Sequence, residues 1–143
     1  SHEQTPAEWE RIEATPLVEA TAVGRAMLTY HRRLVSNAAA AAPWVEIGGE
    51  RMPMATCSYD IGSDVADQLI ERTGSAVAGY FLMNRQGEWQ YGFRSRAGYD
   101  CSVLAQRFGG GGHRQAAGCR SSVPLHQPVT SSPSAAIPGP PSA

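Results

Sequence analysis

Apolar residues in the first third of the chain recur three or four positions apart, which is the spacing of one face of a helix. The pattern holds over 17–38, an alanine run extends it, and Pro43 ends it. Because proline is tolerated at the start of a helix but not inside one, the pattern predicts a long helix over 16–42. Thr5-Pro6-Ala7-Glu8 has the form of a capping box and predicts a short helix ending near residue 14.

Beyond Pro43 the helical spacing gives way to alternation and to turn residues. Residues 44–47 alternate like a strand, Gly48-Gly49 has the composition of a tight hairpin turn, and 51–56 returns as a second strand. Proline cannot donate a backbone hydrogen bond, so Pro53 suits a strand at the edge of a sheet.

The middle of the chain predicts two further helices and a second hairpin. Ser63 is placed to cap a helix through about Arg72, and Gly74 to stop that helix. The remaining expected elements are a buried strand over 76–83, its return strand over 88–96, a helix over 101–108 capped by Asp100, and a last strand over 119–123. This order predicts an α/β fold, a two-layer domain with a mixed β-sheet, preceded by a long N-terminal linker helix.

Composition divides the chain into three parts. We expect a helical linker segment over 5–42 and a folded domain over 43–123. From Pro124 onward the chain is rich in proline, serine and alanine and has no aromatic residue. Such a segment buries too little apolar surface to offset its ordering entropy, so 124–143 is expected to be a disordered tail.

The net charge of the chain is −1, so no overall basic field indicates nucleic-acid binding. Between 85 and 120, however, six arginines stand against Glu88 and Asp100, and such a local excess can attract an anionic ligand. The three cysteines form no Cys-x-x-Cys pair, which argues against a disulfide scaffold and a structural zinc site. No signal peptide or long apolar span is visible, so we expect a cytoplasmic location and no membrane partner.

The stretch 107–118, Arg-Phe-Gly-Gly-Gly-Gly-His-Arg-Gln-Ala-Ala-Gly, carries the clearest chemical signal. Four glycines in a row allow the backbone to approach a ligand closely. Residues 113–117 are expected to open a helical turn, whose free N–H groups and dipole attract an anion. Flanking arginines and His113 would complete a phosphate or carboxylate pocket. The alternative is a flexible linker, as glycine runs often are.

The segment from Gly110 to Gly118 resembles the GGGHxxAAG signature of the C-terminal domain of DHH-family phosphoesterases. Phe93-Arg94-Ser95 resembles the S-x-R-S strand of that domain, although Gly92 stands where the family has its first serine. Residues 100–105 resemble the short helix that leads into the glycines, and the similarity runs from about Trp44 to Arg120. Similar proteins include RecJ-type exonucleases, nanoRNases and related phosphohydrolases.

The resemblance implies a substrate-binding site in this domain. The planar guanidinium of Arg94 can grip a phosphate with two hydrogen bonds, and in similar proteins the histidine of the signature contacts the scissile or terminal phosphate. Strand alternation places Arg94 and Arg96 on one face and Ser95 on the other. The implied substrate-binding residues are Arg94, Ser95, Gly110, Gly111, Gly112 and His113.

In similar enzymes, aspartates and histidines of an N-terminal domain hold two divalent metals, manganese or magnesium, and a metal-bound water attacks the phosphodiester. This chain has four aspartates and no Asp-His-His run. We therefore expect no cofactor in this chain and no activity from it alone. The expected role is to bind a nucleotide, a short oligonucleotide or another phosphate ester for a parent hydrolase whose catalytic domain is missing here. That hydrolase would cleave phosphodiester or phosphoanhydride bonds.

The resemblance does not choose among short oligonucleotides, cyclic dinucleotides, single-stranded nucleic acid and polyphosphate as substrates. An alternative is a free-standing, non-catalytic nucleic-acid-binding module, because the C-terminal region of alanyl-tRNA synthetases carries a related glycine-rich domain. The few aromatic residues and the weakly negative net charge disfavour binding of an extended single strand.

If the metal ligands lie outside this chain, manganese should bind to it weakly or not at all. Isothermal titration calorimetry of the chain with manganese chloride checks this expectation. A tight, stoichiometric site would contradict the assignment of the metals to another domain.

Overall fold

The computed structural model describes residues 17–129 of the chain. The capping box at 5–8 and the part of the expected tail beyond Val129 lie outside the described residues. In chain order the elements are α2 (Leu17–Ala40), β1 (Trp44–Ile47), β2 (Glu50–Thr56), α3 (Tyr59–Thr73), β3 (Val77–Met83), β4 (Trp89–Ser95), α4 (Cys101–Arg107), β5 (Gly111–His113), β6 (Ala116–Ser121) and β7 (His126–Pro128). The chain divides into two compact units, the first ending at Arg33 and the second beginning at Leu34.

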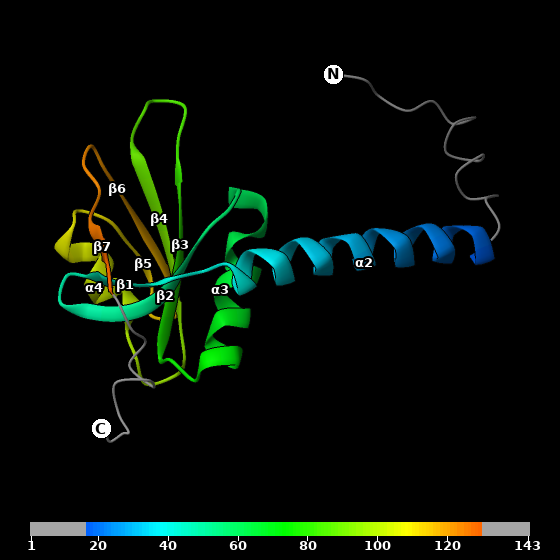
Figure 1. Ribbon diagram of the computed structural model, residues 1–143, viewed down its shortest axis with the longest axis horizontal. Coiled ribbons are helices and arrows are strands. Elements are labelled where there is room, and N and C mark those ends of the chain that lie inside the picture. Colours follow the sequence, from blue (N-terminus) through cyan, green and yellow to red (C-terminus); the bar gives the residue numbers. More distant parts are fainter. Residues whose placement is uncertain (1–16, 130–143) are drawn as a thin grey trace. The chain divides into compact units, whose positions relative to one another are not determined.

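The strands form one mixed sheet in the order β5-β6-β4-β3-β2-β1-β7. Strands β2 and β3 run parallel and are connected by α3, whereas the other described neighbours pair antiparallel. A parallel pair requires a crossover connection, and α3 supplies it. The predicted mixed α/β fold with a preceding helix is therefore confirmed (Figure 1).

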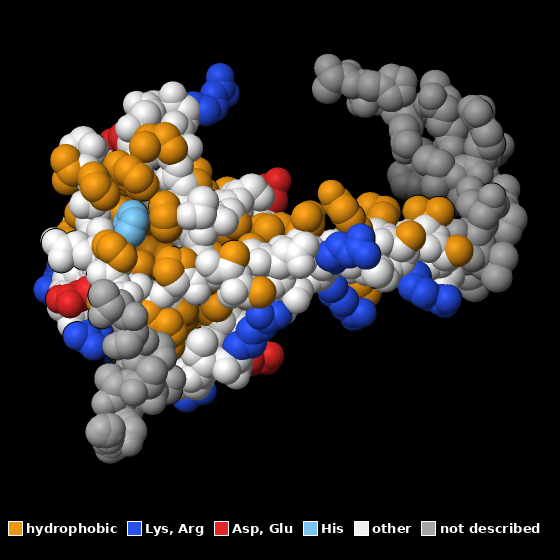
Figure 2. All heavy atoms as spheres, in the orientation of Figure 1, with side chains coloured by type: hydrophobic (Ala, Val, Ile, Leu, Met, Phe, Trp, Pro, Cys, Tyr) orange, Lys and Arg blue, Asp and Glu red, His pale blue; other side chains and the backbone are white. Residues whose placement is uncertain are grey.

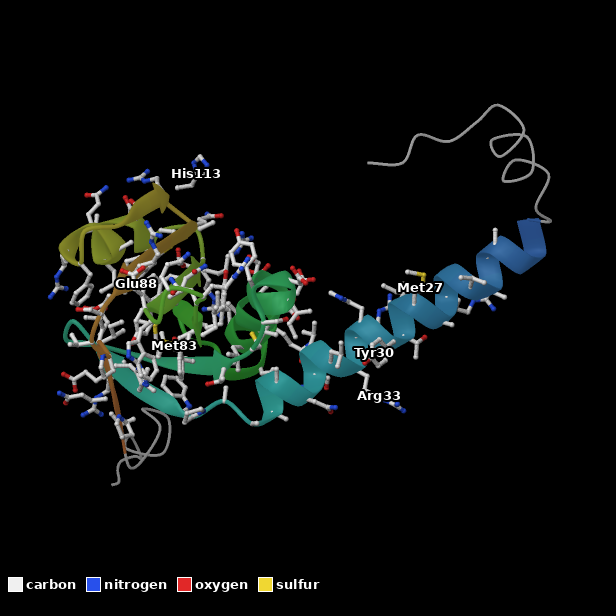
Figure 3. The ribbon with its side chains drawn as sticks, turned by 90° about the horizontal axis from the view of Figure 1, so that it is seen from above. Met27, Tyr30, Arg33, Met83, Glu88 and His113 are labelled. Carbon is white, nitrogen blue, oxygen red and sulfur yellow. The ribbon has the colours of Figure 1, made fainter. Side chains whose placement is uncertain are left out.

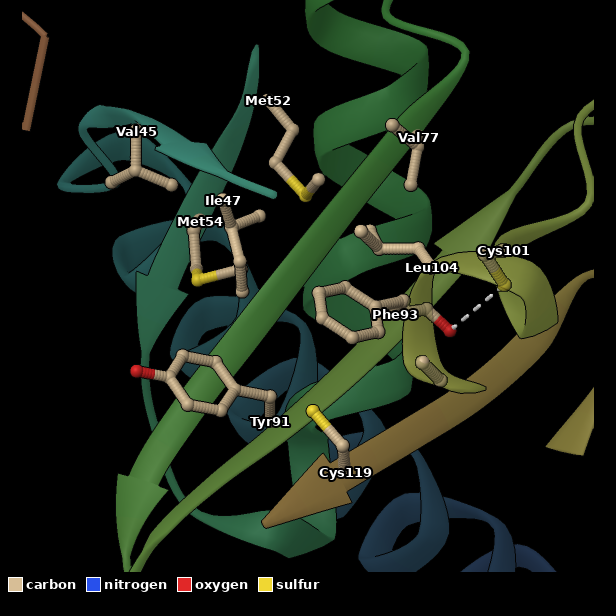
Figure 4. Close-up of a cluster of buried hydrophobic side chains, with 11 residues drawn as sticks. Val45, Ile47, Met52, Met54, Val77, Tyr91, Phe93, Cys101, Leu104 and Cys119 are labelled. Atoms are coloured by element: carbon tan, nitrogen blue, oxygen red, sulfur yellow. Dashed lines mark hydrogen bonds between the residues drawn. The ribbon is translucent and has the colours of Figure 1, made fainter. Parts of the chain in front are cut away.

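Two helices cover opposite faces of this sheet, and each builds its own core. Helix α4 packs on the face that carries Tyr91, Phe93 and Cys119, and Figure 4 shows this cluster with Leu104 of α4 inside it. Helix α3 packs on the other face, where Val65, Ala66, Leu69 and Ile70 meet Ala78 and Tyr80. All four of these α3 residues are buried.

Helix α2 begins and ends within two residues of its predicted bounds. Its last turns bury Val35 and Ala39 in the α3-side core. Along its earlier turns the large apolar side chains are exposed, as Met27 and Tyr30 illustrate, and Figure 2 shows hydrophobic side chains along this helix among its arginines. The backbone closes with a hydrogen bond from Ala42 N–H to Ala39 O ahead of Pro43, which cannot continue a helix.

Two predicted positions in the first half of the sheet domain are wrong. Strand β2 lies inside the sheet, between β1 and β3, so Pro53 is not on an edge strand. It is tolerated because the pairing of β2 with β3 begins one residue later, at Met54. Helix α3 begins at Tyr59, with Ser58 rather than Ser63 at its N-cap, because Ile61 and Gly62 continue its packed face upstream.

The segment 113–117 does not form the predicted helical turn. It belongs to a β-hairpin, in which β5 pairs with β6 and Arg114-Gln115 make the turn. One isolated helical turn is unfavourable, whereas β6 pairs with β4 from Trp89 to Arg94, which satisfies its backbone groups. The turn is also anchored from outside, since Cys101 N–H donates to Arg114 O at 2.8 Å and Ser95 N–H to Gln115 O at 3.2 Å.

Residues 126–128 form a strand where the sequence predicted disorder. Strand β7 pairs with β1, and the segment before it is held by Tyr91, whose hydroxyl accepts the Leu125 N–H at 2.8 Å. The His126 ring lies against Phe81, with centroids 4.4 Å apart. The prediction of disorder failed here because the composition of the tail does not show that the His126 ring packs against aromatic side chains of the sheet.

One buried tyrosine explains two glycines on the α3 side. The Tyr80 ring of β3 lies between Gly62 of α3 and Gly92 of β4, and a Cβ at either glycine would stand 2.3 Å from a ring carbon. Only glycine leaves room for a phenol between the two backbones. Gly92, which departs from the family's serine, is therefore the residue that this packing requires.

Replacing Gly92 by alanine should destabilise the domain by roughly 1–3 kcal/mol, the usual cost of overpacking a core, because the added Cβ would overlap the Tyr80 ring. Urea denaturation followed by circular dichroism measures the change. Gly111→Ala is the matched control, since a Cβ at Gly111 meets nothing within 4 Å. Equal stabilities of the two variants would show that the Tyr80 ring does not need glycine at position 92.

Mild acid should weaken the attachment of β7. The Tyr91 hydroxyl accepts from the Leu125 N–H and lies within hydrogen-bond distance of the His126 ring, 2.8 Å from Nδ1. Burial lowers the pKa of His126 below its ordinary value of 6.5. The unfolded chain then takes up this proton more readily than the folded one, and the stability that neutral His126 contributes is present above pH 6.5 and lost as the pH falls below it.

The comparison that checks this is the free energy of unfolding of the wild type and of His126→Phe at pH 7.5 and pH 5. The phenylalanine keeps the ring contact with Phe81 but carries no proton. The wild type should lose more stability on acidification than the variant. The same loss in both proteins would contradict the role given to His126.

Candidate functional site: a glycine-lined cleft

A cleft of about 800 Å³ opens on the α3 side of the sheet. Helix α3 contacts β2, β3 and β4 on this face, whereas α4 covers β4, β5 and β6 from the opposite face. Among the helices at 17–129, none therefore packs over the α3 face of β6 and β5. The residues lining the cleft are Tyr59, Ser63, Tyr80, Glu88, Gln90, Tyr91, Phe93, Arg94, Gly109, Gly110, Gly111, Gly112, Ala116, Ala117, Gly118, Cys119 and Arg120.

The strand register gives this face of the sheet two adjoining rows. In the first, Arg94 of β4 is the partner of Ala116 of β6, which is in turn the partner of His113 of β5. Directly paired residues present their side chains on the same face, so Arg94 and His113 belong to one face of the sheet. Two strand spacings put their Cα atoms about 10 Å apart.

The neighbouring row carries no side chains on three consecutive strands. Gly92, Gly118 and Gly111 are paired in turn across β4, β6 and β5. The Tyr80 ring covers Gly92, while Gly111 faces open space. The outer part of this row thus exposes backbone to the cleft.

The three glycines at 110–112 differ in why the structure has glycine at each position. A Cβ at Gly110 would stand 2.1 Å from Gly118 O, so only glycine permits that close contact. Gly112 has a φ of 143° and would also place a Cβ 2.6 Å from Ala116 O. Of these three, Gly111 alone has neither a positive φ nor a close contact at the position of a Cβ. Its missing side chain therefore leaves room in the cleft.

The backbone N–H groups at the start of the glycine run are already used. Gly109 N–H donates to Gln106 O at 3.1 Å and Gly110 N–H donates to Ala105 O at 2.9 Å, so both close the end of α4. The expected anion site at a helix N-terminus is therefore wrong, because this segment ends one helix and begins no other. Strand β5 is the edge of the sheet, and its outer side has no strand partner among the described residues.

Arg94 is held in place by an acidic residue of α3. Its Nε lies 3.1 Å from Asp67 Oδ1 and its Nη2 lies 3.4 Å from Asp67 Oδ2. The pair is partly exposed, so it contributes little to stability, but it fixes the orientation of the guanidinium. The remaining N–H groups of Arg94 are available at the wall of the cleft.

Ser95 has a different position from Arg94. It is buried, and its hydroxyl donates to Tyr99 O at 2.7 Å, with Arg114 O also within 3.1 Å. Ser95 is not among the residues that line the cleft. In this structure it ties the end of β4 to the turn of the β5–β6 hairpin.

His113 is exposed at the end of β5, and Figure 3 shows its side chain extending outward from the sheet domain. It shares a face with Arg94 but does not line the cleft. The next residue, Arg114, lies 3.4 Å from Asp100, the cap of α4. The hydroxyl and backbone N–H of Ser102, together with Arg114, hold the pKa of the Asp100 carboxyl below its ordinary value.

The structure brings Arg94, Gly110, Gly111 and Gly112 together around the cleft and leaves Ser95 and His113 outside its lining. Sequence reasoning missed Tyr80, Gln90 and Arg120. Gln90 lies four residues from Arg94 on the same strand, so alternation alone could have placed it on that face. Arg120 and Tyr80 needed the register of β6 and β3 against β4, which the sequence does not contain.

Within residues 17–129 no group of three or more His, Cys, Asp or Glu side chains could hold a metal ion. Nor is any helix in this part of the chain long and apolar enough to cross a membrane.

The fold and this cleft define a small α/β domain whose mixed sheet carries a glycine-lined surface. Residues 54–127 match the DHHA1 domain, and the chain belongs to this family. The matched segment contains the glycine signature and the strand of Arg94, which confirms the resemblance to the C-terminal domain of DHH-family phosphoesterases. No curated protein matches the chain.

Two solved structures are similar to parts of the chain. The crystal structure of an uncharacterized protein from Helicobacter pylori G27 has a TM-score of 0.46 and 19% identity, covering 59% of this chain and 24% of that one. The pGpG-specific phosphodiesterase PggH from Vibrio cholerae has a TM-score of 0.45 and 13% identity, covering 84% of this chain and 38% of that one. The chain thus spans well under half of either protein.

Proposed function

We propose that this chain is the substrate-binding domain of a DHH-family phosphoesterase and that its cleft holds the phosphate of a nucleotide or short oligonucleotide. The observation that supports this most directly is the placement of Arg94 beside the glycine segment in one cleft. Family membership gives the proposal its chemical context, because the matched domain is the one associated with DHH-family enzymes.

The cleft has the parts that anion binding requires. Arg94 presents its free N–H groups with its orientation fixed by Asp67, and a fixed guanidinium loses less entropy when it grips a phosphate. Arg120 lines the cleft next to Gln90, which adds a second positive charge near the bound anion. At Gly111 the absence of a Cβ lets the ligand approach the backbone. His113, on the same face as Arg94, would contact the ligand from the outer edge.

Hydrolysis by the parent protein is proposed to take place between this cleft and a separate catalytic domain. The manganese or magnesium that such chemistry requires does not fit the described residues here, because they bring no cluster of metal-ligating side chains together. This domain would bind and orient the phosphate ester, in the cytoplasm, and would not itself break the bond.

Replacing Arg94 or His113 by alanine should weaken binding of a 5′-phosphorylated dinucleotide by roughly 1–3 kcal/mol each, the range for charge-assisted hydrogen bonds. Calorimetric titration without metal, with backbone amide shifts as a second readout, measures the change. Arg85→Ala is the matched control, because Arg85 is exposed in the β3–β4 turn and does not line the cleft.

A cleft-filling variant tests the same proposal without touching a charge. Gly111→Val places a side chain in open space, so it should leave the fold intact and reduce binding. Unchanged affinity in Arg94→Ala, His113→Ala and Gly111→Val together would remove this cleft as the substrate site.

A further inference from the structure

Tyr80 occupies a position in the cleft that two glycines create. It belongs to β3 and is paired with Gly92, and its ring leans across β4 so that Cε1, Cζ and Oη lie over Gly92. On its other edge, Cε2, Cζ and Cδ2 lie against Gly62 of α3. The ring therefore lies between a helix backbone and a strand backbone, each in close contact with it because neither glycine carries a Cβ.

The hydroxyl of this ring lies at the boundary between α3 and the cleft. A Cβ at Gly92 would stand 2.6 Å from Oη, so the hydroxyl lies above β4, the strand that also carries Arg94. Tyr80, Ser63 and Arg94 all line the cleft. The paired residues that lead from Gly92 toward the open part of the cleft, Gly118 and Gly111, carry no side chains themselves.

The phenol keeps its proton at neutral pH. Burial is the main cause that raises the pKa of Tyr80, and the nearby Tyr59 and Cys57 raise this pKa further. Together they outweigh the lowering of the pKa by Ser63 and Arg94. A neutral phenol is a hydrogen-bond donor, and a phosphate oxygen is a strong acceptor.

We propose that Tyr80 is a further substrate-binding residue, whose hydroxyl donates a hydrogen bond to the terminal 5′-phosphate that Arg94 also contacts. The inference rests on the proposed function of the cleft and adds to it a neutral donor. Gly62 and Gly92 then have a functional consequence as well as a packing one, because they leave room for the ring that carries this donor. In this arrangement Arg94 contributes the positive charge, and Tyr80 contributes a hydrogen-bond donor that orients the phosphate.

The test compares Tyr80→Phe with the wild type in calorimetric titrations of the whole chain with 5′-phosphorylated diadenylate, in the absence of metal. The phenylalanine keeps the ring and removes only the hydroxyl, so the unfolding midpoint should stay close to that of the wild type. Affinity should fall about tenfold, the effect of losing one hydrogen bond to a charged group. Tyr99→Phe is the matched control, because the Tyr99 hydroxyl donates to Glu50 outside the cleft and its loss should leave affinity unchanged.

A second probe separates a phosphate contact from a change in cleft shape. Unphosphorylated diadenylate should bind Tyr80→Phe and the wild type equally, because it lacks the terminal acceptor. An equal loss with both probes, or no loss with the phosphorylated one, would overturn the role of Tyr80. If Arg94→Ala loses affinity while Tyr80→Phe does not, the proposed function stands without this inference. If neither variant loses affinity, both fail.

Discussion

Close approach of backbones at positions without Cβ atoms is the constraint on which the rest of this domain depends. Gly62 and Gly92 leave the width of one phenol ring between α3 and β4, and Gly110 lets the end of α4 lie against Gly118. Each contact would be blocked by a single methyl group. Helix α3 and the β5–β6 hairpin therefore reach their places on the sheet only because these residues are glycines. The cleft follows from the same packing, since α3 ends its cover at β4.

Much of this architecture could be predicted from periodicity and caps. The long helix, both hairpins, the Gly74 stop and the Asp100 cap all depend on neighbouring residues, and Gly74 indeed has a φ of 75°. The wrong predictions concern segments whose structure is determined by residues far away in the sequence. Pro53 is tolerated inside the sheet because of where β3 starts to pair. The segment 113–117 becomes part of a β-hairpin because β4 is there to pair with β6. His126 needed Phe81 and Tyr91, which lie 35 or more residues away in sequence.

At the candidate site, too, some features could be predicted from neighbouring residues and others depend on contacts distant in sequence. The glycine signature and Arg94 could be selected from the chain alone, and the structure brings them to one cleft. The reason first given for the glycines, free N–H groups at a helix start, does not survive, because Gly109 and Gly110 close the end of α4 instead. A sequence motif can thus select residues that come together in one cleft, while the physical reason for those residues depends on how the strands pair.

Arg94 and Ser95 adjoin in one motif, yet strand alternation sends them to opposite sides of the sheet. Arg94 meets Asp67 and the cleft, whereas Ser95 bonds Tyr99 O and holds the hairpin turn from within. The serine thereby fixes the end of β4 and the beginning of the hairpin on which β5 lies, and these two strands carry Arg94 and Gly111. A residue can therefore shape a cleft without lining it. Of these two adjacent positions of the signature, Arg94 faces the cleft, and Ser95 helps to hold the strands that form it.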